Sequence, residues 1–128
     1  VRPPLPLDAS EPTWTEAVEA SSYDAIIASN VLHISPYAVS QGLFAGAGRL
    51  LRPGGGLFVY GPFRVDGAHT ASSNEAFDAR LKAMNADWGV RDSTELARLA
   101  SSYGLTLMER AALPANNCVL CFKRLDAE

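Results

Sequence analysis

The hydrophobic positions of the chain fall into short apolar runs that alternate with helical stripes. Tyr23–Ala28 is an apolar run with polar residues on either side, which predicts a strand buried on both faces, as in a parallel sheet. Ser35 and Pro36 then offer a helix cap and a first helical residue, and an apolar stripe of helical period follows them up to Pro53. After three glycines, Leu57–Tyr60 forms a second apolar run. Strand, helix and strand with short connections predict a βαβ unit.

Two further helices are predicted in the second half of the chain. A long polar loop over residues 61–73 precedes the first of them, and Asn74 could cap it. Asp92 and Glu95 have the spacing of a capping box, which places the start of the last helix at this point. Gly104 follows the last apolar position of that helix and is expected to end it.

The chain closes with two segments that read as strands, 105–111 and 118–123. Their short connection makes them antiparallel neighbours. The complete order predicts one domain over residues 1–128, an α/β fold with a mostly parallel sheet and one antiparallel strand. Ligands of such sheets bind at the carboxyl ends of the strands, so we expect functional residues after Ala28 and Tyr60.

Composition and charge exclude several classes of function. The chain has 128 residues, 48% of them hydrophobic and 20% charged, with a net charge of −3. This balance is that of a globular domain and provides no electrostatic basis for binding nucleic acid or an anionic membrane. No apolar run approaches the roughly 20 residues of a membrane span, and no signal peptide opens the chain. We therefore expect a soluble, cytoplasmic protein without a nucleic-acid or membrane partner.

Two cysteines, Cys118 and Cys121, form a C-x-x-C pattern, which invites a redox or metal-binding interpretation. Residues three apart in a strand point to opposite faces, and a single pair cannot complete a zinc site. We expect both to be small buried apolar residues, and we expect no metal site.

Two segments resemble class I methyltransferases that use S-adenosylmethionine. The run from Tyr23 to Ile34 resembles the fourth-strand motif of these enzymes, and the run from Leu50 to Tyr60 resembles the helix end, glycine turn and fifth strand that follow it. The resemblance implies a Rossmann-like class I methyltransferase sheet, mostly parallel with an antiparallel terminal strand. It also implies S-adenosyl-L-methionine as the cofactor.

A narrower resemblance extends over the whole chain, to the methyltransferase-like protein 26 family of small, poorly characterised proteins. It is carried by His33–Pro36, Gly42–Ala47, Tyr60–Phe63, Ser73–Asp78, Asp87–Asp92 and Pro114–Asn117. Members of that family begin with a strand and a glycine-rich loop for the methionine end of the cofactor, and then a strand with an acidic residue for the ribose. Neither is present here. By this pattern the chain would begin just before the third strand, at Leu5–Asp8, as an N-terminally truncated domain.

The resemblance and the strand-end rule together suggest cofactor-binding residues: Asp8, Asn30, Val31 and His33. By the family pattern Asp8 would accept a hydrogen bond from the adenine amino group, and Asn30 with Val31 would line the cofactor pocket. His33 could instead bind the substrate or act as a base near neutral pH, which makes it a candidate catalytic residue. The structural alternatives are a turn residue for Asp8 and Asn30, and a helix-capping role for His33.

Substrate-side candidates follow the fifth strand and lie in the later loops. Tyr60 is also a candidate for the catalytic step, because an aromatic ring can attract a sulfonium through its face. The substrate-side set is Tyr60, Phe63, Asn74, Asp78, Trp88, Arg91 and Asn116, with Gly61, Pro62, Asp92 and Asn117 beside it. The alternatives are core rings, turn residues, or an Asp–Arg pair that only joins two loops. His69, in the long loop, is expected to be exposed to solvent.

Three functional hypotheses result. The first is a methyltransferase acting on an unknown small-molecule or protein acceptor. The second is a non-catalytic, truncated methyltransferase-like remnant or binding module that needs a partner or its missing N-terminal half. A nucleotide- or flavin-binding module is the weakest, because no other phosphate-binding loop is present. An exposed sheet edge could also support a homo-oligomer.

Overall fold

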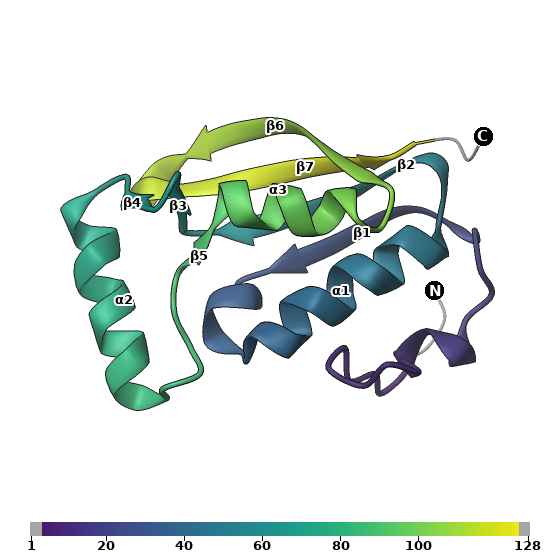
Figure 1. Cartoon of the computed structure of the whole chain (residues 1–128), viewed down its shortest axis with the longest axis horizontal. Helices are drawn as coiled ribbons and strands as arrows, with labels where there is room; N and C mark the ends of the chain where they lie inside the picture. The colour runs from purple at the N-terminus through teal and green to yellow at the C-terminus, as the bar shows by residue number, and fades with distance from the viewer. Residues whose placement is uncertain (1–3, 126–128) are drawn as a thin grey trace.

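The computed structural model of the chain describes residues 4–125. Figure 1 shows α1 and α3 side by side in front of one sheet, with α2 set apart at one end. In chain order the elements are η1 (Trp14–Ala17), β1 (Tyr23–Ser29), η2 (Leu32–Ile34), α1 (Tyr37–Leu50), β2 (Leu51–Gly61), β3 (Phe63–Val65), β4 (Ala68–His69), α2 (Ser72–Met84), β5 (Arg91–Asp92), α3 (Ser93–Ser101), β6 (Leu105–Leu113), η3 (Pro114–Asn116) and β7 (Asn117–Arg124).

The main sheet has four strands in the order β1-β2-β7-β6. β1 pairs with β2 in parallel, and β7 pairs antiparallel with β2 on one side and with β6 on the other. Three strands therefore run in one direction and β7 runs against them, which confirms the mostly parallel α/β sheet. The antiparallel strand is last in the sequence but lies between β2 and β6 in space.

The hydrophobic core lies between this sheet and the two helices α1 and α3. Alternate residues of β2 and β7, such as Leu57 and Phe122, face these helices and are fully buried. Phe44 of α1 meets Phe122 edge-on, with ring centroids 4.9 Å apart, an arrangement that aromatic pairs favour. On α3, Leu96 and Ala100 complete the contact.

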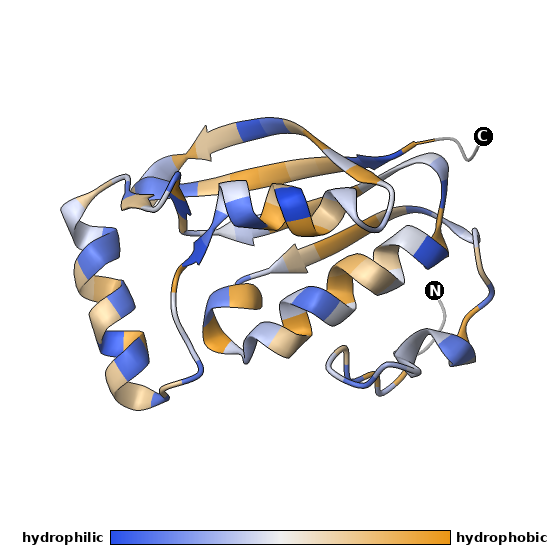
Figure 2. Cartoon of the chain, viewed as in Figure 1, coloured by the Kyte–Doolittle hydropathy of each residue, from blue (hydrophilic) through white to orange (hydrophobic). Residues whose placement is uncertain are grey.

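The opposite face of the sheet is open in the part of the chain that the structure describes. Ile27 of β1 is 75% exposed and Phe58 of β2 is 37% exposed. The prediction that β1 is buried on both faces is therefore wrong. The middle of β1 is coloured hydrophobic in Figure 2, yet the helices α1 and α3 pack against only one side of the sheet. An apolar run shows that a strand can be covered on both faces, but it does not supply the element that covers it.

A second, small sheet was missed from the sequence. β3 pairs antiparallel with β4 and parallel with β5, in the order β4-β3-β5. Two of its strands, β3 and β4, occupy part of the expected polar loop over 61–73. These strands have only two or three residues, which is too short for an alternating pattern to be visible.

The helix starts were predicted with mixed success. Asp92 caps α3, with Oδ1 accepting the N–H groups of Thr94 at 2.8 Å and Glu95 at 3.3 Å, as the capping spacing predicts. Asn74 does not cap α2, because it lies inside the helix, which starts at Ser72. Ser35 does not cap α1 either. Its hydroxyl donates to the Val31 carbonyl, and the helix begins after Pro36.

The N-terminal segment packs along α1. Trp14 anchors it, with Nε1 donating to the Gly42 carbonyl at 3.0 Å. Gly42 and Gly46 leave room for this contact, since a side chain on either would overlap the segment. Leu5–Asp8 form no strand, contrary to the family pattern.

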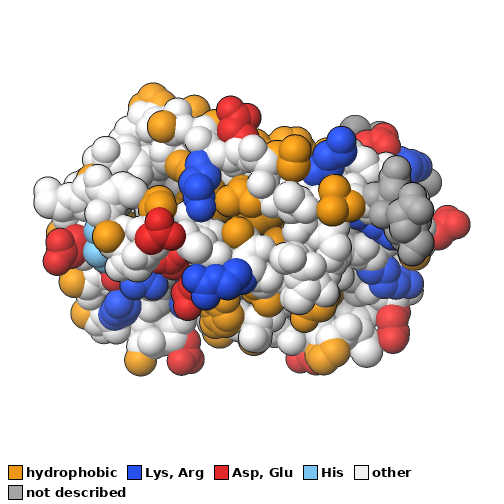
Figure 3. Space-filling model, turned by 45° about the horizontal axis from the view of Figure 1, so that its top comes forward, with side chains coloured by type: hydrophobic (Ala, Val, Ile, Leu, Met, Phe, Trp, Pro, Cys, Tyr) orange, Lys and Arg blue, Asp and Glu red, His pale blue; other side chains and the backbone are white. Residues whose placement is uncertain are grey.

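The surface carries both signs of charge. On the face shown in Figure 3, basic and acidic side chains lie close together, with hydrophobic side chains between them. No helix within residues 4–125 is long and apolar enough to cross a membrane.

Candidate functional site

A pocket lies where β1 and β2 end and β7 begins, at the edge of the sheet at which the sequence predicted a site. Its volume is about 270 Å³. We call it the strand-end pocket. It is lined by Asn30, His33, Pro62, Ser73, Asn74, Phe77, Ala115 and Asn117.

Asn30 joins the ends of the two parallel strands. It follows β1 directly with a φ of 55°, a left-handed conformation that asparagine tolerates better than most residues. Its backbone N–H donates to the Tyr60 carbonyl at 2.9 Å, while its side chain stays exposed at the pocket. The local turn thus brings an exposed amide group to the wall of the pocket.

His33 lies in η2 and is buried, at 5% exposed, although it lines the pocket. Its ring centroid is 5.7 Å from that of Phe77 on α2. On the other side it packs against Gly61, where an added Cβ would lie 3.2 Å from Nδ1. Burial lowers the pKa of His33 below its ordinary value of 6.5, and the nearby Arg91 cation lowers it further. The imidazole is therefore neutral at pH 7 and can accept a proton.

Arg91 of β5 makes its hydrogen bonds to backbone carbonyls. Nε donates to the Leu32 carbonyl at 3.1 Å, and Nη2 donates to the carbonyls of Ser35 at 2.7 Å and Asp87 at 2.9 Å. The guanidinium also lies 5.3 Å from the centre of the Tyr37 ring. Arg91 thus joins two backbone segments beside the pocket, the turn that carries His33 and the loop before β5.

Asparagines connect the last strand to the rest of the site. The side-chain amide of Asn117 donates to the Tyr60 hydroxyl at 3.1 Å. Asn74 Nδ2 donates to the Asn116 carbonyl at 3.0 Å, and Asn116 Nδ2 donates to the Ser73 hydroxyl at 3.0 Å. Asn116 has a φ of 59°, so it also forms the turn before β7.

Asp78 is buried on α2 and holds a small charge cluster. Its Oδ2 lies 3.3 Å from His69 Nε2 and 3.0 Å from Lys82 Nζ. The prediction that His69 is exposed is wrong: its side chain is 18% exposed. Within residues 4–125, its Nδ1 is buried without a hydrogen-bond partner. The loop was expected to be open, but β4 lies against α2 and carries His69 to Asp78.

The predicted cofactor set is only partly brought together. Asn30 and His33 line the strand-end pocket, and Val31 lies between them in the chain, partly exposed. Asp8 is elsewhere, in the exposed N-terminal segment, where its carboxylate accepts hydrogen bonds from the Ser10 backbone and hydroxyl. Those two hydrogen bonds lower the pKa of Asp8.

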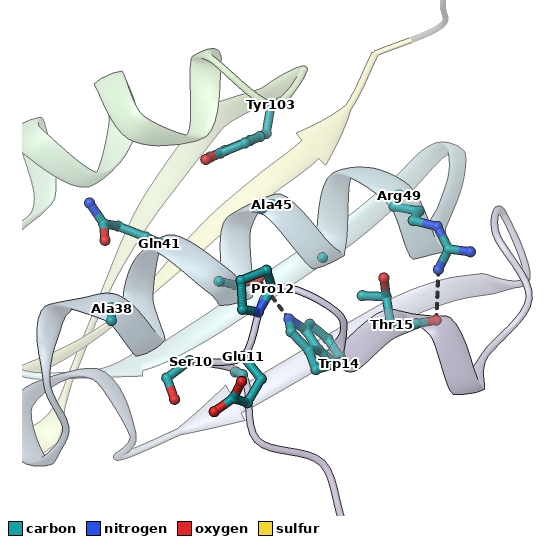
Figure 4. A pocket seen from close by; sticks show the side chains of 13 residues that line it. Ser10, Glu11, Pro12, Trp14, Thr15, Ala38, Gln41, Ala45, Arg49 and Tyr103 are labelled. Atoms are coloured by element: carbon teal, nitrogen blue, oxygen red, sulfur yellow. Dashed lines mark hydrogen bonds between the residues drawn. The ribbon is translucent and has the colours of Figure 1, made fainter.

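The segment after Asp8 lines a second pocket, of about 370 Å³, along the outer side of α1. Figure 4 shows Trp14 and Pro12 against one side of the helix, with Gln41 and Tyr103 across from them. This pocket and the strand-end pocket share no lining residue.

The remaining substrate-side candidates have different surroundings. Phe63 is 5% exposed and belongs to the hydrophobic core, so its ring is a core ring, the alternative given above for the aromatic candidates. Tyr60 is half-buried, Trp88 is half-buried in the loop before β5, and Asp92 is occupied as a helix cap. Phe77 was not proposed from the sequence, although it lies inside Ser73–Asp78, a segment that carries the narrower family resemblance.

The two cysteines both lie on β7. Cys118 and Cys121 are both free and half-buried. Cys118 packs against the core, as do its alternate neighbours on β7, which leaves Cys121 on the other face, as predicted. Burial raises the pKa of both thiols. No group of three metal-ligating side chains occurs within the described residues.

The sequence profile of a family described as "Protein of unknown function (DUF938)" matches residues 1–124. Among solved structures, an O-methyltransferase family protein from Burkholderia thailandensis has a TM-score of 0.76 at 16% identity, covering 94% of this chain and 35% of that chain. Human N-acetylserotonin methyltransferase in complex with SAM has a TM-score of 0.74 at 16% identity, covering 93% of this chain and 32% of that chain.

A third similar structure is an O-methyltransferase family 2 protein from Planctomyces limnophilus in complex with apigenin. It has a TM-score of 0.73 at 17% identity, covering 81% of this chain and 31% of that chain. At such identities the likeness shows the fold, a Rossmann-like sheet of the class I methyltransferase type. The chain spans about a third of the length of the proteins it matches.

Proposed function

The chain belongs to the family of proteins of unknown function DUF938, and from that premise we propose that it forms part of an S-adenosylmethionine-dependent methyltransferase. The acceptor would be a small molecule or a protein. The observation that carries the proposal is the position of Asn30 and His33 in one pocket at the carboxyl ends of β1 and β2. In open α/β sheets, ligands bind at this edge.

The polar groups of the pocket fit the demands of methyl transfer. When bound, the cofactor supplies a methyl group carried on a sulfonium, so the protein mainly has to position the reactants and exclude water. Asn30 presents an exposed amide that can hydrogen-bond the cofactor, and Val31 offers an apolar contact beside it. At about 270 Å³ the cavity is below the usual range for a whole ligand, so it would accommodate the reacting end.

His33 is suited to the proton transfer that an acceptor hydroxyl requires. As the oxygen gains the methyl group, its proton must leave, and a neutral imidazole nitrogen of His33 can take it. The lowered pKa of His33 keeps the ring in that neutral form at pH 7. Tyr60 would act on the same site indirectly, through its hydrogen bond with Asn117.

We also propose the narrower relationship to the methyltransferase-like protein 26 family. Four of its segments supply pocket residues. His33–Pro36 provides His33, Tyr60–Phe63 provides Pro62, Ser73–Asp78 provides Asn74 and Phe77, and Pro114–Asn117 provides Ala115 and Asn117. A fifth, Asp87–Asp92, contains Arg91, which contacts the turn that carries His33. The resemblance thus coincides with the pocket rather than with the core alone.

Calorimetric titration of S-adenosylmethionine tests the proposal, with the longest native polypeptide that contains this chain. We expect saturable binding, weakened about tenfold by Asn30→Gly, which corresponds to one lost hydrogen bond. Glycine accepts the positive φ of this position, so the variant removes the amide without backbone strain. Ser21→Gly, at another positive-φ position, is the matched control. A folded sample that binds no cofactor would favour the non-catalytic module instead.

A further inference from the structure

The turn that carries His33 has little support of its own. η2 has only three residues, and no side chain caps it. Residues 30–36 connect β1 to α1, and a short 3₁₀ turn of this kind is not stable by itself. The orientation of the His33 ring therefore depends on contacts from outside the turn.

Those contacts come from Arg91, the first residue of β5, and from the loop just before it. Arg91 donates to the carbonyls of Leu32 and Ser35, which bracket His33 in the chain. The Gly89 N–H donates to the carbonyl of His33 itself, at 3.0 Å. Three hydrogen bonds from the short segment 89–91 thus hold the backbone at Leu32, His33 and Ser35.

The loop is in turn fixed to α2. The Val90 N–H donates to Asp78 Oδ1 at 2.8 Å in a buried contact. Gly89 packs tightly there, since an added Cβ would lie 3.0 Å from the same oxygen. On the other side, the Arg91 guanidinium stacks on Tyr37, the first residue of α1. The support of His33 is therefore built from three separate elements.

We propose that Arg91 is a positioning residue, which aims the His33 ring into the strand-end pocket by holding the carbonyls on both sides of it. The inference rests on the proposed function, because it gives His33 a task in the transfer. Arginine suits this role, since its planar fork can meet several acceptors in fixed directions, whereas lysine offers one point of attachment. Small displacements of a reacting group, of about 1 Å, can cost on the order of 100-fold in rate.

The test compares Arg91→Gln and Arg91→Lys with a control, Arg98→Gln. The control removes the same single positive charge as Arg91→Gln, but at an exposed position on α3. With methyl transfer to the accepted substrate as the assay, we expect Arg91→Gln to lower kcat about 100-fold and to change KM less than about threefold. Arg91→Lys should recover only part of this loss. Arg98→Gln should leave both parameters unchanged.

A second readout does not depend on catalysis. The chain has two histidines, so NMR can follow the imidazole of His33 with His69 as an internal reference. The charged groups near His33 are Arg91 and, across Phe77, Arg80. In Arg91→Gln we expect the pKa of His33 to rise and its contact with the Phe77 ring to weaken. At a fixed pH, the His69 ring signals should stay where they are in the unchanged protein.

The outcomes separate this inference from the proposed function. If the unchanged protein transfers no methyl group, the proposed function fails, and the NMR experiment still decides whether Arg91 positions His33. If a folded Arg91→Gln leaves both kcat and the His33 signals unchanged, the positioning role is overturned. Failure of both Arg91 variants to fold would assign the residue to stability and would also overturn it.

Discussion

Oδ2 of Asp78 lies 3.3 Å from Nε2 of His69. Asp78 belongs to α2 and His69 to β4. The same carboxylate also forms an ion pair with Lys82 and accepts a hydrogen bond from the backbone N–H of Val90. A buried carboxylate with these partners joins the helix, the small sheet and the loop that supports His33. The free-energy cost of burying this carboxylate is offset only while both of its oxygens have hydrogen-bond or ion-pair partners.

Replacement of Asp78 should therefore lower stability. We expect Asp78→Ala to reduce the free energy of unfolding by about 1–3 kcal/mol, because the buried Val90 N–H loses its acceptor. Asp78→Asn keeps an oxygen for that N–H and should cost less. Urea denaturation measures both. Asp87→Ala, at an exposed position, is the control and should stay within about 0.5 kcal/mol. Equal stability of Asp78→Ala and the unchanged protein would contradict the network.

The same carboxylate predicts a dependence on pH. Burial raises the pKa of Asp78, but the Val90 N–H and Lys82 outweigh it, so the pKa lies below its ordinary value of 3.8. The stabilisation is then present above the unfolded-state pKa of about 4 and is lost as the pH falls through the folded-state value. The stability gap between the unchanged protein and Asp78→Asn should be full at pH 7 and shrink below about pH 4.

The sequence predicted the main sheet because its signals are local. The runs Tyr23–Ala28 and Leu57–Tyr60, with a helical stripe between them, are sufficient for a βαβ unit. The capping spacing at Asp92 is equally local, and the structure confirms it. The sequence also predicted the edge of the sheet at which the pocket lies, because the strand-end rule depends only on the strand order.

Long-range contacts account for what the sequence did not show. His69 is half-buried because β4 lies against α2 and brings its ring to Asp78, nine residues further along the chain. Asn74 donates to the carbonyl of Asn116, far away in sequence, instead of capping its helix. Arg91 was proposed as a substrate contact, and its backbone partners at Leu32 and Ser35 have no sequence signature. Such pairings arise only when elements dock, so no local pattern predicts them.

His33 provides a prediction that needs no substrate. Its folded-state pKa lies below 6.5, first because of burial and then because of Arg91. The neutral ring therefore contributes stability that is present above the unfolded-state pKa and is lost as the pH falls through the folded-state value. We expect the free energy of unfolding of the unchanged protein to fall between pH 7.5 and pH 5 more than that of His33→Gln. Parallel pH curves for the two proteins would contradict the assignment.

The Tyr60–Asn117 hydrogen bond should be measurable as a coupling between two strands. Tyr60→Phe removes the hydroxyl that accepts from Asn117 at 3.1 Å and should cost about 0.5–1.5 kcal/mol of unfolding free energy. If this bond is the main role of the hydroxyl, the costs of Tyr60→Phe and Asn117→Ala will not add in the double variant. Tyr103→Phe, at an exposed tyrosine, is the control. Additive costs would mean that the hydroxyl acts elsewhere.

The contact between α1 and the N-terminal segment can be tested at Gly46. An alanine there would overlap the Trp14 ring, so we expect Gly46→Ala to lower the free energy of unfolding by about 1–3 kcal/mol. Helix propensity alone predicts the opposite sign, a gain of up to about 1 kcal/mol over glycine. The two effects can be separated in a Trp14→Ala background, where the overlap with the ring is gone. Gly46→Ala should then become neutral or stabilising in urea denaturation, whereas the same loss in both backgrounds would show that Trp14 does not pack on Gly46.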